Sequence, residues 1–147
     1  MCDADSPQPS LALRVVYEDL PDFVEIHTAV QYQGWTAAGT AYAAPSDVSS
    51  QARSLLTWSL DPAGECRFEI GGNSANGSLS QHFAPVDLSG HCVCHIQLTA
   101  GGESGAVPMG RKWRVSLEIP VEPGQVESFA RQLVELGERR RDAAQTG

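Results

Sequence analysis

The sequence predicts an α+β domain: a mostly antiparallel sheet of about six or seven strands, with one internal helix and a C-terminal helix packed on one face. Apolar and polar residues alternate along most of the chain, which is typical of half-buried strands. Two segments instead repeat apolar residues at helical spacing. Because no internal repeat or change of composition appears, we expect a disordered segment at 1–10, a single domain over 11–138 and a flexible tail at 139–147.

The first third of the domain predicts three antiparallel strands that follow one another in a meander. Residues 11–17 form an apolar run, and a turn at 18–22 follows. In the segment 23–32, Val24, Ile26, Val30 and Tyr32 alternate with polar residues, so we expect a strand with one buried face. Gly34 then turns the chain into a third strand over 35–44.

The middle of the chain predicts the internal helix and one further strand. Pro45 is followed by Ser46 and Asp47, either of which can cap a helix that we expect over 47–57. A turn at 61–64 leads into a strand over 65–70, and the composition of 71–80 is that of a flexible loop. A further extended stretch is expected over 79–86.

The last third predicts two strands and the closing helix. Residues 91–99 alternate, with Cys92, Cys94, Ile96 and Leu98 on the core face. After a loop at 101–110, a second strand places a set of five apolar residues on its core face: Trp113, Val115, Leu117, Ile119 and Val121. The stripe of the C-terminal helix consists of Val126, Phe129, Ala130, Leu133 and Leu136.

The composition is that of an acidic globular protein. Ten Lys and Arg against eighteen Asp and Glu give a formal net charge of −8, and three of the positive charges lie together at 139–141. Such a protein repels nucleic-acid phosphates and anionic lipid, so we expect neither partner, whereas a basic protein would be attracted to it. The alternative reading is that the charge only maintains solubility. The sequence leaves the oligomeric state open.

The cellular location and the state of the thiols follow from the first residues and from the cysteines. The opening residues lack the basic and apolar regions of a secretory signal, and no run approaches the ~20 apolar residues of a membrane span. We therefore expect a cytoplasmic protein with four reduced thiols, at Cys2, Cys66, Cys92 and Cys94.

No metal, cofactor or catalytic site is expected. His91 and His95 flank Cys92 and Cys94, but strand alternation puts the thiols and imidazoles on opposite faces and separates the two histidines by roughly 13 Å, too far to share a zinc ion. The glycine-rich segment at 71–78 lacks the lysine of a phosphate-binding loop. Serines and histidines occur without a recognisable nucleophile motif, so we expect a binding protein and not an enzyme.

The early strands offer the residues that we expect to bind a partner. Glu25 and His27 lie opposite the expected core, and Trp35 and Tyr42 are aromatic residues of the neighbouring strand. Aromatic anchors surrounded by acidic groups are suited to a protein interface.

The order of elements in the last two-thirds of the chain resembles the C-terminal part of WapI-type immunity proteins and related uncharacterised bacterial domains. The matching segments are 55–60, 65–68, 89–93, 96–98, 113–119, and Glu122-Pro123-Gly124-Gln125 leading into 126–136. This resemblance implies a cytoplasmic antitoxin that binds and neutralises a cognate polymorphic or contact-dependent toxin. Alternatives are a small-molecule-binding or accessory domain that uses the sheet face as a pocket, and a hydrolase that uses His91 or His95.

Overall fold

The computed structural model describes residues 10–17, 24–71, 77–87, 89–100, 113–138 and 143–145. It confirms an α+β fold with one internal and one C-terminal helix. In chain order the elements are β1 (Ser10–Tyr17), β2 (Val24–Tyr32), β3 (Trp35–Ala43), α1 (Pro45–Leu60), β4 (Cys66–Ile70), β5 (Gly77–Pro85), β6 (Cys92–Ala100), β7 (Trp113–Val121), α2 (Pro123–Gly137) and β8 (Ala143–Gln145).

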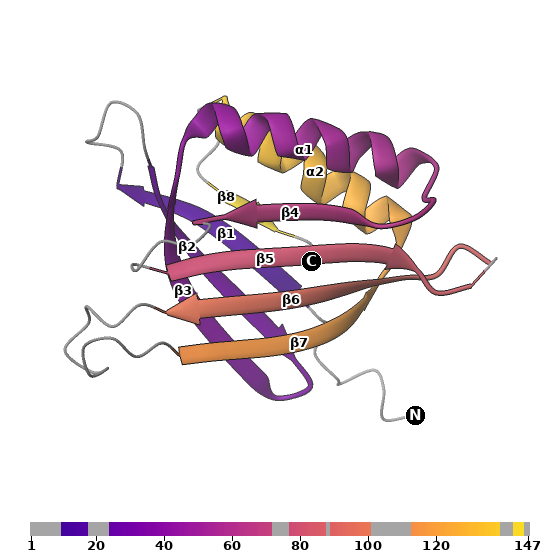
Figure 1. Ribbon diagram of the computed structural model, residues 1–147, viewed down its shortest axis with the longest axis horizontal. Helices are drawn as coiled ribbons and strands as arrows, with labels where there is room; N and C mark the ends of the chain where they lie inside the picture. Colours follow the sequence, from indigo (N-terminus) through magenta and orange to yellow (C-terminus); the bar gives the residue numbers. More distant parts are fainter. Residues whose placement is uncertain are drawn as a thin grey trace.

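The strands divide between two four-stranded sheets. One sheet has the order β3-β2-β1-β8 and the other has the order β4-β5-β6-β7, with antiparallel pairing throughout. The β1–β3 meander is therefore as expected. Figure 1 shows the strands of the two sheets crossing, with β4–β7 in front and the other sheet behind. The helices α1 and α2 lie side by side and pack against the β4 and β8 edges.

The core lies where the two sheets and the two helices meet. β2 alternates as predicted, with Val24, Ile26 and Val30 buried and His27 exposed. The core residues that the sequence indicated for β6 and α2 are all buried: Cys92, Cys94, Ile96, Leu98, Val126, Phe129, Ala130, Leu133 and Leu136. Period-2 and period-3.6 patterns therefore identified the buried faces of these elements.

Three local expectations are wrong. Residues 143–145, assigned to the flexible tail, pair with β1 as β8, and Ala144 is fully buried. Residues 77 and 78, assigned to a loop, belong to β5, which begins two residues before the extended stretch expected over 79–86. Val115 shares its strand face with core residues but is 40% exposed, because it lies on the edge strand β7.

The start of α1 also differs from the expectation. Ala44 is the N-cap and makes no side-chain capping hydrogen bond, so neither Ser46 nor Asp47 caps the helix. Pro45 takes the first helical position, where its missing N–H costs no hydrogen bond.

Several expectations lie outside the described residues: the segment 1–9, the turn at 18–22, the middle of the glycine-rich segment at 72–76 and the loop at 101–110. Within the described part, neither helix is long and apolar enough to cross a membrane.

Candidate functional site

The β2–β3 hairpin sets the geometry of the candidate binding residues. Its two-residue loop has positive φ at both positions, 50° at Gln33 and 83° at Gly34, as tight hairpin turns require. This loop pairs Tyr32 with Trp35 and, further along, Glu25 with Tyr42. A two-residue loop determines every later pair, so the sequence contained the signal that Glu25 and Tyr42 would be neighbours.

On the outer face of this hairpin, Glu25 is held between two side chains. The Tyr42 hydroxyl donates a hydrogen bond of 2.7 Å to Glu25 Oε1, and His27 Nε2 lies 3.1 Å from Glu25 Oε2. The Glu25 side chain is 22% exposed and that of His27 is 51% exposed. We call these three residues the Glu25 cluster. Because two partners orient the carboxylate, it presents a fixed acceptor to a cationic group that approaches the face.

Trp35 is not part of this cluster. Residues of β3 that share the outer face with Tyr42 are separated from it by an even number of positions, and Trp35 is seven positions away. Trp35 therefore belongs to the opposite side of the sheet, at the hairpin tip, where 71% of it is exposed. The structure brings together Glu25, His27 and Tyr42 and separates Trp35 from them.

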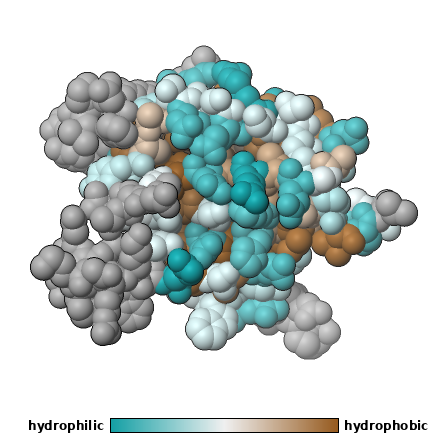
Figure 2. All heavy atoms as spheres, in the orientation of Figure 1, coloured by the Kyte–Doolittle hydropathy of each residue, from teal (hydrophilic) through white to brown (hydrophobic). Residues whose placement is uncertain are grey.

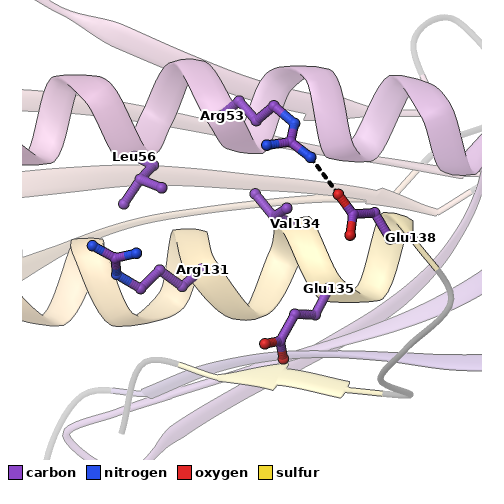
Figure 3. A pocket seen from close by; sticks show the side chains of 6 residues that line it. All are labelled: Arg53, Leu56, Arg131, Val134, Glu135 and Glu138. Atoms are coloured by element: carbon purple, nitrogen blue, oxygen red, sulfur yellow. Dashed lines mark hydrogen bonds and ion pairs between the residues drawn. The ribbon is translucent and has the colours of Figure 1, made fainter.

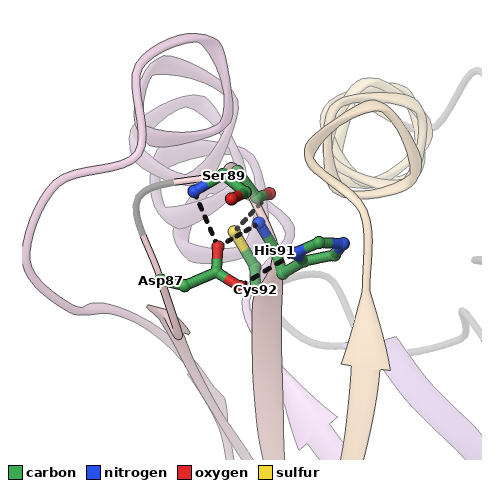
Figure 4. A network of polar contacts seen from close by, with 5 residues as sticks. Asp87, Ser89, His91 and Cys92 are labelled. Carbon is green, nitrogen blue, oxygen red and sulfur yellow. Dashed lines mark hydrogen bonds and ion pairs between the residues drawn. The ribbon is translucent and has the colours of Figure 1, made fainter.

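A second polar arrangement lies between β5 and β6 (Figure 4). Asp87 accepts hydrogen bonds from the backbone N–H groups of Ser89 and His91, and its second oxygen lies 2.9 Å from His91 Nδ1. The hydrogen bond to His91 lowers the pKa of Asp87, and the same bond raises the pKa of His91. Both side chains are largely exposed, and the arrangement closes the turn between β5 and β6.

Beside that turn is a shallow hollow of about 610 Å³, lined by Pro62, Ala63, Pro85, Val86, Asp87, Gly90, Cys92 and Pro123. Burial raises the pKa of the Cys92 thiol, which faces this hollow. A neutral thiol is a poor nucleophile, so Cys92 contributes packing surface here.

A smaller groove of about 390 Å³ runs between the two helices and is lined by Arg53, Leu56, Arg131, Val134, Glu135 and Glu138 (Figure 3). Arg53 of α1 pairs with Glu138 at the end of α2, while Arg131 hydrogen-bonds Glu127 within α2. The side chains of Arg53 and Arg131 are more than half exposed, so these pairs add little stability.

The outer face of the β4–β7 sheet is hydrophilic (Figure 2). It carries a contact that the sequence analysis missed: Ser116 Oγ of β7 and His95 Nε2 of β6 lie 2.9 Å apart. On the same face, His82 is the cross-strand neighbour of His95 and lies 3.7 Å from Glu69. The contact of Ser116 with His95 depends on how β7 pairs with β6, and the long connection between these two strands gives no signal of that register in the sequence.

The cysteines of the described segments behave as core residues. Cys66, Cys92 and Cys94 are free, and burial raises the pKa of Cys94 to about 12. His91 and His95 face away from these thiols and contact Asp87 and Ser116 instead. No group of three or more His, Cys, Asp or Glu in the described part of the chain is arranged to hold a metal ion.

Comparison with known proteins identifies no family. No model of a protein family matches the chain, and no curated protein matches it either. Among solved structures, it is similar to the plant transcriptional regulator PBF-2, with 10% sequence identity over 90% of this chain and 77% of that chain, at a TM-score of 0.44. At this identity and TM-score, the likeness carries no argument about this chain.

Proposed function

We propose that this protein is an immunity protein that binds and neutralises a cognate bacterial toxin of the polymorphic or contact-dependent kind. The resemblance of its last two-thirds to WapI-type immunity proteins suggests this class. The observation that carries the proposal is the Glu25 cluster, an oriented carboxylate on an exposed sheet face of a protein with a net charge of −8.

A basic toxin domain is the partner that suits these features. The net negative charge would accelerate the encounter with a positively charged surface. After docking, Glu25 would accept a hydrogen bond from an arginine or lysine of the toxin, with Tyr42 as the neighbouring aromatic contact. Since Tyr42 and His27 already restrict the Glu25 carboxylate, less conformational entropy is lost on binding than with a free side chain.

The proposal places the protein in the cytoplasm and acting by stoichiometric binding, without catalysis. A small-molecule-binding or accessory domain remains the competing proposal, in which the sheet face would form a pocket. The two hollows described above lie between the helices and beside the β5–β6 turn, so they do not favour that alternative.

The deciding experiment is co-expression with a candidate toxin encoded beside the gene. We expect the chain to rescue growth and to co-purify with the toxin in a stoichiometric complex. Failure on both counts would reject the immunity proposal and leave the ligand-binding alternative.

Substitution of Glu25 tests the site separately from the function. Glu25→Gln keeps the shape and removes the charge, whereas Glu65→Gln makes the same change of net charge at an exposed position of the segment before β4. A hot-spot residue contributes about 2 kcal/mol or more, so Glu25→Gln should weaken the complex about 30-fold and Glu65→Gln much less. Equal effects of the two variants would show that only overall charge matters and would move the site elsewhere.

Salt dependence tests the electrostatic part of the proposal. Raising ionic strength from about 50 to 500 mM shortens the screening length, so association should slow much more than dissociation accelerates. Surface plasmon resonance measures both rates. An association rate that does not change with salt would contradict electrostatic steering.

A further inference from the structure

The strand β7 lies at the edge of the β4–β7 sheet. It forms nine consecutive pairs with β6 without a bulge, and the sheet order places no described strand on its other side. Long, regular edges of this kind are templates for pairing with a further strand. Which residues could pair follows from the hydrogen-bond pattern of the sheet.

The backbone groups of β7 that point away from β6 belong to its even-numbered residues. The Val86 N–H donates to the His91 carbonyl at 2.8 Å, so the odd-numbered residues of β6 bond towards β5. The even-numbered residues of β6 then bond to β7, where they pair with odd-numbered positions. Pro120 agrees with this pattern, because its nitrogen, which has no hydrogen, points outward where a sheet tolerates it. Arg114, Ser116 and Glu118 therefore carry the free backbone donors and acceptors.

The side chains of β7 are incompletely covered on both faces. On the inner face, Val115 is 40% exposed and Leu117 only partly buried. On the outer face, Arg114 and Glu118 are exposed, and neither has an ion-pair partner among the residues that the structure describes. Four positions apart on a strand, they are separated by roughly 13 Å and cannot pair with each other.

We propose that a second copy of this chain pairs antiparallel along β7, with a two-fold axis at Ser116. This register places Arg114 opposite Glu118 of the partner subunit, and symmetry repeats that pair. It also places Val115 opposite Leu117 of the partner subunit, so the exposed apolar side chains cover each other.

Other registers fit less well. A shift of two residues places Arg114 opposite Ser116 or Pro120 of the partner subunit, so Arg114 no longer pairs with Glu118. A shift of one residue opposes free backbone groups with groups already bonded to β6. Charge complementarity and the backbone pattern therefore select the same register.

The β2–β3 hairpin supports the same occupant. β3 crosses beneath β6, and a Cβ added to Gly39 of β3 would lie 3.9 Å from the Leu98 side chain of β6. Figure 1 shows the hairpin projecting past β7. A partner strand added to β7 would extend the front sheet towards this hairpin. Trp35, exposed on the inner side of the tip, would then have an apolar surface to cover it.

Sedimentation velocity on the purified full chain, over a range of concentrations and without any toxin, tests the proposal. We expect a monomer–dimer equilibrium. Arg114→Glu and Glu118→Arg each place like charges opposite one another at two symmetric positions, so each should weaken the dimer about tenfold or more. A mixture of the two variants should restore dimers, because every cross-strand pair then joins opposite charges.

Matched controls separate the interface from general effects. Arg67→Glu makes the same charge reversal on the exposed face of β4 and should leave the dimer intact. Ser116→Pro removes an outward N–H and should prevent pairing, whereas Ser116→Ala removes only the hydroxyl and should not. Circular dichroism verifies that each variant is folded.

A monomer at every concentration would overturn the proposal, and so would a dimer that the mixture of charge variants fails to restore. Because no toxin is present, neither result bears on the immunity function. A chain that rescues growth but sediments as a monomer would keep the proposed function and reject the β7 dimer.

Discussion

Replacing Gly137 with alanine should loosen the contact between the two helices. Gly137 is the last residue of α2, and the close approach of α1 leaves no room for a side chain there. A Cβ at this position would lie 2.6 Å from the Ser49 nitrogen and 2.7 Å from the Pro45 carbonyl oxygen. Both are backbone atoms at the start of α1, so relief requires a shift of one helix against the other.

The size of the effect follows from two opposing terms. Forcing an additional carbon into a packed interior costs typically about 1–3 kcal/mol. Alanine is a better helix former than glycine by up to about 1 kcal/mol, which offsets part of that cost at a helix end. We therefore expect Gly137→Ala to reduce the free energy of unfolding by about 1–2 kcal/mol.

Gly124 provides the matched control in the first turn of the same helix. A Cβ there would have no atom within 4 Å, so Gly124→Ala should stabilise the protein by about 0.4–1 kcal/mol through the unfolded state. Urea denaturation measures both free energies, and for a chain of this length a loss of 1 kcal/mol lowers Tm by about 2–4 °C. If Gly137→Ala proved as stable as Gly124→Ala, the helices would not be in the close contact described here.

Three further predictions concern single residues. His91 should titrate above its ordinary pKa of about 6.5, and Asp87→Asn should lower its midpoint in an NMR titration. Since the folded pKa of His91 is raised and that of Asp87 is lowered, their interaction should stabilise the protein fully from about pH 4 to 6.5. The stabilisation should be lost as the pH rises through the folded pKa of His91 or falls through that of Asp87. A His91 midpoint that does not move in Asp87→Asn would contradict this. Iodoacetamide at pH 8 should modify the half-buried Cys66 of the native protein well before Cys94, because burial keeps the Cys94 thiol protonated, and equal rates would refute that order. A denatured, non-reduced sample should contain four free thiols. Thr28→Val should raise the free energy of unfolding by about 1 kcal/mol, because the buried Thr28 hydroxyl has no hydrogen-bond partner among the described residues, and a loss of stability would mean that it has one.

The sequence by itself determined the local structure of this protein and the buried face of most elements. Strand alternation identified Cys92 and Cys94 as core residues, and helical spacing identified Phe129 and Leu133. These inferences succeeded because periodicity depends on neighbouring residues alone. The two-residue loop also carried a local signal that pairs Glu25 with Tyr42 and puts Trp35 on the other side of the sheet, but the prediction had grouped Trp35 with Glu25, His27 and Tyr42.

Only the tertiary structure decided how these elements meet. It divided the strands between two sheets and gave the tail residue Ala144 a buried place beside β1, although alanine has little preference for strands. Val115 is exposed because no described segment covers the edge of the sheet at β7. Ser116 lies beside His95 because β7 pairs with β6, although a long connection separates these two strands in the sequence. Gly77 must lack a side chain because the carbonyl oxygen of Thr40 in the crossing sheet occupies that space. The burial of these residues and their contacts depend on which distant surfaces pack together, and no local pattern of apolar residues specifies that choice.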